Sequence, residues 1–356
     1  MSVLAETSLN MNAADFSPKL PPYREFYELL LKVSSFYENS SVSYRPSDRL
    51  GNPGGLLDFR CKNSAGQGGT YKRNLPLVVV PDLHARLYFL KNILFFKLPV
   101  NFVCDECGNA LSVVQALEKN LIRLVCVGDG LHSEARGKER WLKAWDEFGK
   151  GRWSGKAMKE EMAEGLALMK LVMECKCHFP EAFHFLKGNH ENIESLEYGG
   201  DFPFHKFVQE SFMTRRFIVD YYGDDILYLY SGFEKDLPLI ALFDNCIVSH
   251  AEPVRAFSYE ELVDCRVLPE VVQGLIWTAN GTAECGNTEK MLSDFTKNED
   301  SVYFAGHRPI FGKYNLLNDA RFIQIHNPEE QNVVLVYPDR KFNPETDIVC
   351  VENAEK

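Results

Sequence analysis

Short apolar runs recur along the chain from Leu75 onward, and each of them ends abruptly in a polar cluster. The runs LPLVVV, LIRLVCV, FHFLK, CIVSH and VYFA lead into PDLH, GDG, GNHE, AEP and GHRP. Runs of this length that are rich in Val, Ile, Phe and Leu are typical of buried strands. The pattern therefore predicts five strands whose carboxyl ends carry polar residues.

Segments with helical periodicity stand between and around these runs, at 22–38, 109–119, 135–149, 156–175, 203–217 and 287–297. Strands that alternate with helices predict a layered α/β fold. In such folds ligand sites gather at the carboxyl ends of the strands, which is where the polar clusters stand.

Composition along the chain predicts its organisation. Residues 1–73 are expected to form an N-terminal helical extension and a linker, because 39–73 is rich in Ser, Gly, Asn and Pro. The main domain is expected at 74–340 and a tail at 341–356. A helical insertion is expected at 133–180, and it is either additional scaffold or a cap that shapes the substrate site.

Bulk properties limit the classes of partner. The chain has 356 residues, 45% of them hydrophobic, and a formal net charge of −11, so no overall field attracts a nucleic-acid duplex. No apolar run approaches the roughly 18 residues of a membrane helix, so no membrane partner is expected. The first residues lack a basic and then apolar leader, and Cys126 and Cys246 lie in apolar runs. We expect a cytoplasmic protein with reduced thiols.

The first two polar clusters offer metal ligands. Asp82 and His84 are two residues apart at a strand end, so both side chains can point the same way. Asp129 follows Gly128 at the end of the next strand, and its two carboxylate oxygens can bridge two cations. Each signal alone also fits ordinary polar residues at a strand end or in a turn.

The remaining clusters add ligands and an acid. Asn189 in GNHE offers an amide oxygen, and His190 beside it is placed to protonate a leaving alkoxide. His250 and His307 each follow an apolar strand, where a lone histidine is more often structural. Because five such clusters appear in one chain, the set favours a metal centre over separate accidents.

The order Asp-x-His, Gly-Asp, Gly-Asn-His-Glu, His, Gly-His resembles the calcineurin-like metallophosphoesterase superfamily. LPLIALFDNCIVSHAEP at 237–253 and LIWTANG at 275–281 are similar to segments of its phosphoprotein phosphatase and diadenosine tetraphosphatase branch. The resemblance covers about residues 75–338. It implies a four-layer αββα sandwich of two mixed β-sheets with flanking helices and the metal site at strand carboxyl ends.

The resemblance also implies a dinuclear metal-dependent phosphoesterase, a hydrolase acting on ester bonds as a phosphatase or phosphodiesterase. Asp82 and His84 would bind the first divalent ion and Asp129 would bridge. Asn189, His250 and His307 would bind the second. The ions would be Mn, Fe, Zn or Mg, with Mn or Fe preferred, and a bridging hydroxide would attack phosphorus while His190 acts as general acid. The substrate would be a phosphorylated small molecule, a nucleotide or a phosphoprotein.

The second motif departs from the family pattern Gly-Asp-x-x-Asp/Asn-Arg. His132 stands where an Asp often supports the catalytic histidine, and Ser133 stands where an Arg often grips phosphate. Arg86, Arg308 and His132 are the remaining candidates for substrate contacts, since a guanidinium forms bidentate bonds to phosphate. The departure leaves a second hypothesis open, a catalytically impaired metal-binding interaction module of the same fold.

Overall fold

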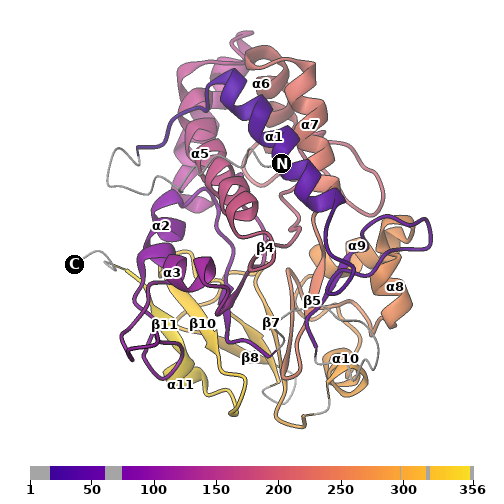
Figure 1. The fold of residues 1–356 in the computed structure, drawn as a ribbon. Helices are drawn as coiled ribbons and strands as arrows, with labels where there is room; N and C mark the ends of the chain where they lie inside the picture. The colour runs from indigo at the N-terminus through magenta and orange to yellow at the C-terminus, as the bar shows by residue number, and fades with distance from the viewer. Residues whose placement is uncertain (1–16, 61–73, 297, 318–320, 353–356) are drawn as a thin grey trace, which may run out of the picture.

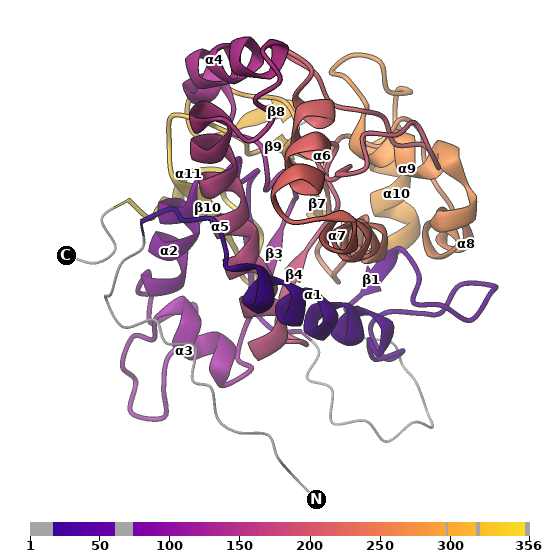
Figure 2. The ribbon, with the colours of Figure 1, turned by 90° about the horizontal axis from the view of Figure 1, so that it is seen from above.

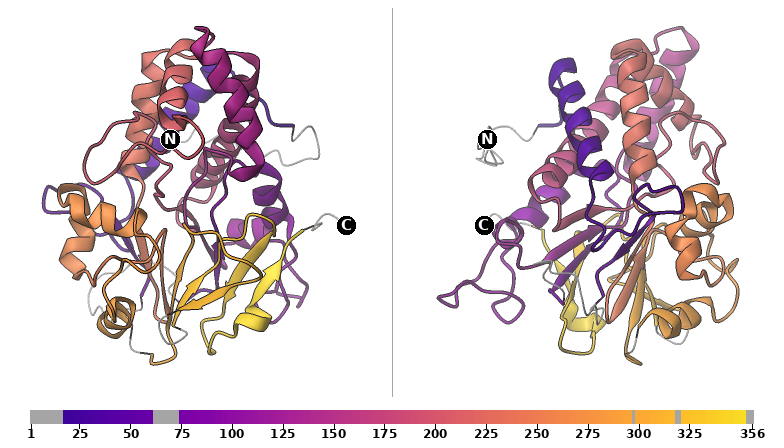
Figure 3. Two further views of the ribbon diagram at one scale, coloured as in Figure 1. Left: turned by 180° about the vertical axis from the view of Figure 1, so that it is seen from behind. Right: turned by 45° about the vertical axis from the view of Figure 1, so that its right-hand side comes forward.

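The computed structural model describes residues 17–60, 74–296, 298–317 and 321–352. Two mixed β-sheets pack face to face, with helices on both outer faces (Figure 1). This architecture confirms the predicted four-layer α/β sandwich. The helices α1, α5, α6 and α7 gather at one end of the molecule and the strands at the other, as two further views show (Figure 3).

The five-stranded sheet has the order β11-β10-β2-β3-β4. Its strands are β2 (Leu77–Val80), β3 (Arg123–Cys126), β4 (Phe183–Phe185), β10 (Asn332–Val336) and β11 (Ile348–Cys350). The strands β2, β3 and β4 run parallel, whereas β10 is antiparallel to β2 and to β11.

The six-stranded sheet has the order β1-β5-β6-β7-β9-β8. Its strands are β1 (Leu56–Asp58), β5 (Ile240–Leu242), β6 (Cys246–Ser249), β7 (Val302–Ala305), β8 (Asn315–Leu317) and β9 (Phe322–Gln324). The strands β6, β7 and β9 run parallel. Five of the strands in the two sheets, namely β2, β3, β4, β6 and β7, coincide with the apolar runs that predicted them.

Side chains alternate between two cores along each strand. On β2, Leu77 and Val79 point into the layer between the sheets, and Val78 and Val80 point toward the helices. All four are buried, because helices cover one face and the second sheet covers the other. This explains why the strand reads as a continuous apolar run and not as an alternating one.

Helices close both outer faces of the sandwich. The five-stranded sheet is covered by α2 (Leu87–Phe95), α3 (Val113–Glu118) and α5 (Lys156–His178). Beyond them, α1 (Tyr23–Glu38) packs on α5 and on α7 (Asp224–Asp236), and α6 (Glu210–Tyr221) packs on α7. The six-stranded sheet is covered by α8 (Tyr259–Val263), α9 (Pro269–Ile276) and α10 (Asn287–Phe295). The remaining helices are α4 (Lys138–Gly149), α11 (Pro344–Asp347) and the short 3₁₀ turns Ala135–Gly137 and Cys265–Val267.

The two ends of the chain are built into the sandwich to a greater extent than their composition predicts. The helix α1 packs against α5 and α7 (Figure 2) and buries Phe26, Leu30 and Val33. The expected linker contributes β1 to one sheet, and the expected tail contributes β11 to the other. Sequence patterns missed both strands because each has only three residues. Residues 1–16, 61–73 and 353–356, parts of the predicted extension and tail, lie outside the described residues.

Within the part of the chain that the structure describes, no helix is both long and apolar enough to cross a lipid bilayer.

Candidate metal centre

Five loops that follow parallel strands meet at one edge of the sandwich. The loop after β2 carries Asp82 and His84, the loop after β3 carries Asp129, and the loop after β4 carries Asn189 and His190. The loops after β6 and β7, in the other sheet, supply His250 and His307. The structure therefore brings all six candidate ligands and the candidate acid together, and it buries every one of them except His307, which is half-buried.

Asp129 lies at the middle of this group. Its Oδ2 atom is 3.6 Å from His84 Nε2, 3.6 Å from His190 Nε2 and 3.5 Å from His250 Nε2. Asp82 Oδ2 lies 3.9 Å from His84 Nε2, and Asp82 Oδ1 lies 3.9 Å from His250 Nδ1. A carboxylate between two sets of donors has the placement that a bridging ligand needs.

The second set of donors converges closely on one point. Asn189 Oδ1 lies 3.0 Å from His250 Nε2 and 2.9 Å from His307 Nδ1, and the two histidine nitrogens are 3.2 Å apart. Because these three potential ligand atoms are so close together, a shared cation would fit between them and Asp129 only after small side-chain shifts. An amide oxygen and two imidazoles suit a divalent transition metal.

Backbone hydrogen bonds fix the rings of two of the candidate ligands. The Nδ1–H of His84 donates to the carbonyl of His132 at 3.0 Å, and the Nδ1–H of His250 donates to the carbonyl of Val127 at 3.0 Å. A neutral imidazole that donates from one nitrogen presents a lone pair at the other. In both rings the nitrogen with the lone pair is Nε2, the atom that faces Asp129.

The loops adopt strained conformations to deliver these side chains. His84, Asp129 and His307 have φ values of 41°, 54° and 64°, in the left-handed region that residues other than glycine rarely occupy. A Cβ atom at Gly306 would lie 1.9 Å from Asp82 Oδ1, so only glycine lets the carboxylate approach the backbone there. Such strain is typical of a functional site held in place by its surroundings.

Glu191 ties two of the loops together. Its carboxylate accepts hydrogen bonds from the backbone N–H groups of Asp129, Gly130 and Gly188, each at 2.8 Å. The backbone N–H of His190 donates to Asp129 Oδ1 at 3.0 Å. These bonds hold the bridging position and the candidate acid in one rigid unit.

The electrostatics of the centre are dominated by the burial of its carboxylates and imidazoles. Burial, followed by the nearby Glu191 and Asp82, raises the pKa of Asp129 well above its ordinary value. Burial lowers the pKa of His84 to about 4 and also lowers that of His250, so the rings are neutral near pH 7. Asp82 Oδ1 and His307 Nε2 are buried without a hydrogen-bond partner. Neutral imidazoles, crowded carboxylates and unpaired buried donor atoms all fit bound divalent cations.

The unusual second motif forms a histidine pair. The Nδ1 atom of His132 lies 3.2 Å from that of His190, and its Nε2 atom lies 3.0 Å from the hydroxyl of Thr214 on α6. The ring of Phe204 lies over His190 with 3.6 Å between the centroids. His132 thus lies beside the candidate acid with both ring nitrogens engaged by protein groups, a placement that gives its predicted substrate contact no support.

Ser133 forms hydrogen bonds to a helix of the insertion. Its hydroxyl donates to the buried carboxylate of Glu161 on α5 at 2.6 Å, and its backbone N–H donates to the same group at 2.9 Å. Arg140 on α4 pairs with Glu161 from the other side. Trp141 is fully buried and lies 5.8 Å from the His132 ring. These contacts favour the scaffold alternative for the two helices of the insertion.

The two candidate arginines differ in their hydrogen-bond partners and in their exposure. The guanidinium of Arg86 donates to the backbone carbonyls of Asp82, Leu83, Asn327, Pro328 and Glu330. Its donors are therefore engaged, and the predicted phosphate contact of Arg86 finds no support. Arg308 is exposed beside His307, and no side-chain partner holds it among the described residues. Of these two arginines in the described chain, Arg308 is therefore the one that is free to contact a phosphate.

Two further residues at the centre carried little signal in the sequence. His326 lies two residues beyond β9, and its Nδ1 atom is 3.7 Å from Asp82 Oδ2. Glu134 lies 3.5 Å from His84 Nε2 and 3.0 Å from His326 Nε2. For His326 the clue was the strand pattern FIQI before it, which also fits a packed, hydrogen-bonded histidine.

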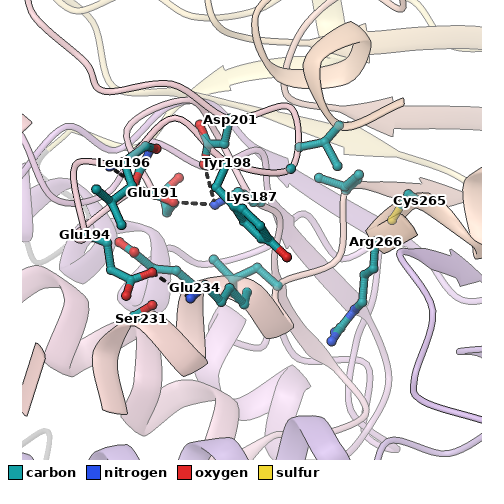
Figure 4. Close-up of a pocket in the computed structure, with 16 residues that line it drawn as sticks. Lys187, Glu191, Glu194, Leu196, Tyr198, Asp201, Ser231, Glu234, Cys265 and Arg266 are labelled. Carbon is teal, nitrogen blue, oxygen red and sulfur yellow. Dashed lines mark hydrogen bonds and ion pairs between the residues drawn. The ribbon is translucent and has the colours of Figure 1, made fainter. Parts of the chain in front are cut away.

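A cavity of about 240 Å³ lies on the far side of the Gly-Asn-His-Glu loop (Figure 4). Lys187 reaches across its wall to Asp201, with Nζ 2.9 Å from Oδ2, and also donates to the carbonyl of Glu191. None of the six candidate metal ligands in the described chain lines this cavity, which shares Glu191 with the centre. The Lys187–Asp201 ion pair therefore supports the Gly-Asn-His-Glu loop on the side of the cavity.

No protein-family model matches the chain, and no curated protein sequence matches it. Among solved structures, it is similar to a protein serine/threonine phosphatase from Saccharomyces cerevisiae with similarity to human phosphatase PP5. The TM-score is 0.51 at 13% sequence identity, over 93% of this chain and 89% of that one. A cold-active protein-tyrosine phosphatase of a psychrophilic Shewanella species also aligns, over 78% of this chain and 80% of that one. Its TM-score of 0.40 at 14% identity carries no weight. The first likeness extends over nearly the whole of both chains, and the chain therefore has the fold of a serine/threonine phosphatase.

Proposed function

We propose that this chain is a metal-dependent phosphoesterase that hydrolyses a phosphate ester on a phosphorylated small molecule, nucleotide or phosphoprotein. The observation that carries the proposal is the convergence of Asp82, His84, Asp129, Asn189, His250 and His307 at one edge of the sandwich. The ligand atoms of Asp82, Asp129 and His250 lie within 4.8 Å of one another, as do those of His84, Asp129 and His190. Two divalent ions, with Mn or Fe preferred, would supply charge neutralisation and an activated water there.

The residues of the chain would divide the remaining work. His190 Nε2 faces the centre, 3.6 Å from Asp129 Oδ2, while its Nδ1 contacts His132. As general acid, His190 would be an imidazolium that donates its Nδ1–H to His132 and gives its Nε2 proton to the leaving oxygen, which returns the ring to the neutral form. His132 would then carry its own hydrogen at Nε2 and donate it to the Thr214 hydroxyl, which holds that tautomer. Arg308 would contact the phosphoryl oxygens from the open side.

Hydrolysis of p-nitrophenyl phosphate and bis-p-nitrophenyl phosphate with Mn²⁺ tests the proposal. The wild-type chain should turn over at least one of them, and Asp129→Asn should reduce kcat by at least about 100-fold because it removes the bridging charge. His178→Asn on α5, outside the centre, is a control that should retain the activity. A full rate in excess chelator, or an active Asp129→Asn variant, would contradict the proposal.

A second candidate, a metal-binding interaction module without turnover, is favoured by two contacts of His190. The ring of Phe204 covers His190, and a histidine stands beside it in place of a carboxylate. This candidate predicts bound metal with no hydrolysis of any phosphoester. A metal-dependent rate that falls on His190→Ala would exclude it, whereas metal binding without any rate in a broad substrate screen would favour it.

A further inference from the structure

His326 is a buried histidine with one nitrogen engaged and the other unpaired. It is 0% exposed. Its Nε2 atom lies 3.0 Å from Glu134 Oε2, and its Nδ1 atom has no hydrogen-bond partner. A neutral ring that donates Nε2–H to a carboxylate presents its lone pair at Nδ1. This is the arrangement by which an outer carboxylate orients a metal-ligating histidine.

The unpaired nitrogen points into the first half of the centre. Nδ1 of His326 lies 3.7 Å from Asp82 Oδ2, and the ring lies 5.2 Å from that of His84. Asp82, His84 and His326 each offer one ligand atom, and these atoms all lie within 4.8 Å of one another. A third donor therefore converges with the two that the sequence singled out.

We propose that His326 is a protein ligand of the first metal ion, oriented by Glu134. With Asp129 as the bridge, that site then has two imidazoles and two carboxylates, whereas the ligands predicted from the sequence include one imidazole. This proposal rests on the proposed function, because it concerns the same centre. The added nitrogen shifts the preference of the site toward Zn²⁺, Co²⁺ or Fe²⁺ and away from Mg²⁺.

The position of the Glu134 side chain fits a role in orienting His326. Its side chain is 11% exposed and spans the two histidines, with Oε1 3.5 Å from His84 Nε2 and Oε2 3.0 Å from His326 Nε2. Lys206 Nζ lies 3.9 Å away at the surface side. The carboxylate thus holds His326 through Nε2, the nitrogen that does not face Asp82, where a neutral glutamine could not polarise the ring as strongly.

Metal binding by the full chain tests the proposal with Co²⁺ as the probe. The chain is stripped with a chelator and titrated with Co²⁺, with stoichiometry and d–d absorption as readouts besides activity. The wild-type chain should bind two Co²⁺ ions. His326→Ala should weaken one of them by about 100-fold or more, and Glu134→Gln should weaken the same one by about 10- to 100-fold. The changed absorption should report the loss of a nitrogen ligand.

His184→Ala is the matched control, since His184 is also a buried histidine but lies on β4 outside the centre. It should lower stability without changing Co²⁺ binding. A folded His326→Ala chain that binds two Co²⁺ ions with wild-type affinity and absorption would overturn the proposal. If His326→Ala does not fold, Glu134→Gln decides, and an unchanged affinity would overturn it. Failure of the wild-type chain to bind any Co²⁺ would instead contradict the proposed function.

Discussion

The Nδ1 atoms of His132 and His190 lie 3.2 Å apart in a buried contact between two loops. Burial lowers the pKa of His132 to about 3 and that of His190 well below its ordinary value, and the surrounding histidines lower both further. Both rings are therefore neutral near pH 7, and one must donate its Nδ1–H to the other. The family pattern places an aspartate beside the catalytic histidine, and its negative charge supports that ring. His132 is neutral and supplies no such charge, so His190 is a weaker base and a less charged donor.

Replacing His132 by aspartate should change the pH dependence of hydrolysis. A carboxylate that accepts the Nδ1–H of His190 favours its protonated form and so raises its pKa. A general acid works only while protonated, so activity should persist to higher pH. We expect the alkaline limb of kcat/KM for p-nitrophenyl phosphate to move upward in His132→Asp.

Thr214→Val is the control for this change, because it removes a hydrogen bond to His132 without adding a charge. Its alkaline limb should stay close to that of the wild-type chain. Identical profiles for His132→Asp and the wild-type chain would show that His190 is not the titrating acid.

Arg308→Ala should weaken substrate binding and leave the metal centre intact. The side chain is exposed beside His307, and a charge-assisted bond to phosphate contributes about 1.5–3 kcal/mol. We expect kcat/KM to fall about 10- to 100-fold, mainly through KM, with unchanged metal content. An unaltered KM would show that another group holds the phosphate.

Arg86→Ala should instead lower stability. Its guanidinium donates to five backbone carbonyls in the loops after β2 and β9, four of them in part-buried contacts and one, that of Glu330, in an exposed one. Leaving these acceptors without a donor should cost about 2–4 kcal/mol of the free energy of unfolding, measured by urea denaturation. A variant with full stability but a raised KM would indicate instead that Arg86 contacts the substrate.

Arg140→Ala should destabilise the fold through Glu161. The Glu161 side chain is 1% exposed, and Arg140 and Ser133 are its partners. Removing the arginine leaves a buried carboxylate short of a counter-charge, at a cost of about 2–3 kcal/mol in urea denaturation. The exposed pair Lys290–Asp294 on α10 gives the comparison, because Lys290→Ala should cost less than about 1 kcal/mol. Equal losses in the two variants would argue against this account.

Lys176→Met should remove a pH dependence of stability. Burial lowers the pKa of Lys176 from 10.5 to about 7. Between these values the unfolded chain binds a proton that the folded chain does not, so this group makes stability rise as pH rises from 7 to 10.5. The difference in the free energy of unfolding between wild type and variant should therefore grow in favour of the wild type over that range, by up to a few kcal/mol.

Lys170→Met on the same helix provides the control, because its side chain is 30% exposed. It should not alter the slope of stability against pH. A Lys176→Met variant with the wild-type slope would show that the ammonium is solvated in the folded chain.

The sequence alone was sufficient to predict the fold class and to select the six candidate metal ligands. Strands buried on both faces produce continuous apolar runs, and parallel strands bring their carboxyl ends to one edge, so residues after such runs are predicted to meet. Asp82, Asp129 and His250 are far apart in sequence, yet each follows such a run. The two short edge strands β1 and β11 escaped prediction, because three residues contain too little periodicity to be recognised.

Only the tertiary structure decided the surroundings of these candidates. Arg86 and Arg308 both stand beside a ligand motif, but backbone carbonyls from a distant loop engage the first and leave the second exposed. His326 comes close to Asp82 because β9 lies next to β7 in the sheet, a pairing that no local pattern encodes. Local periodicity fixes which residues end a strand, whereas long-range packing fixes which side chains then share one buried volume.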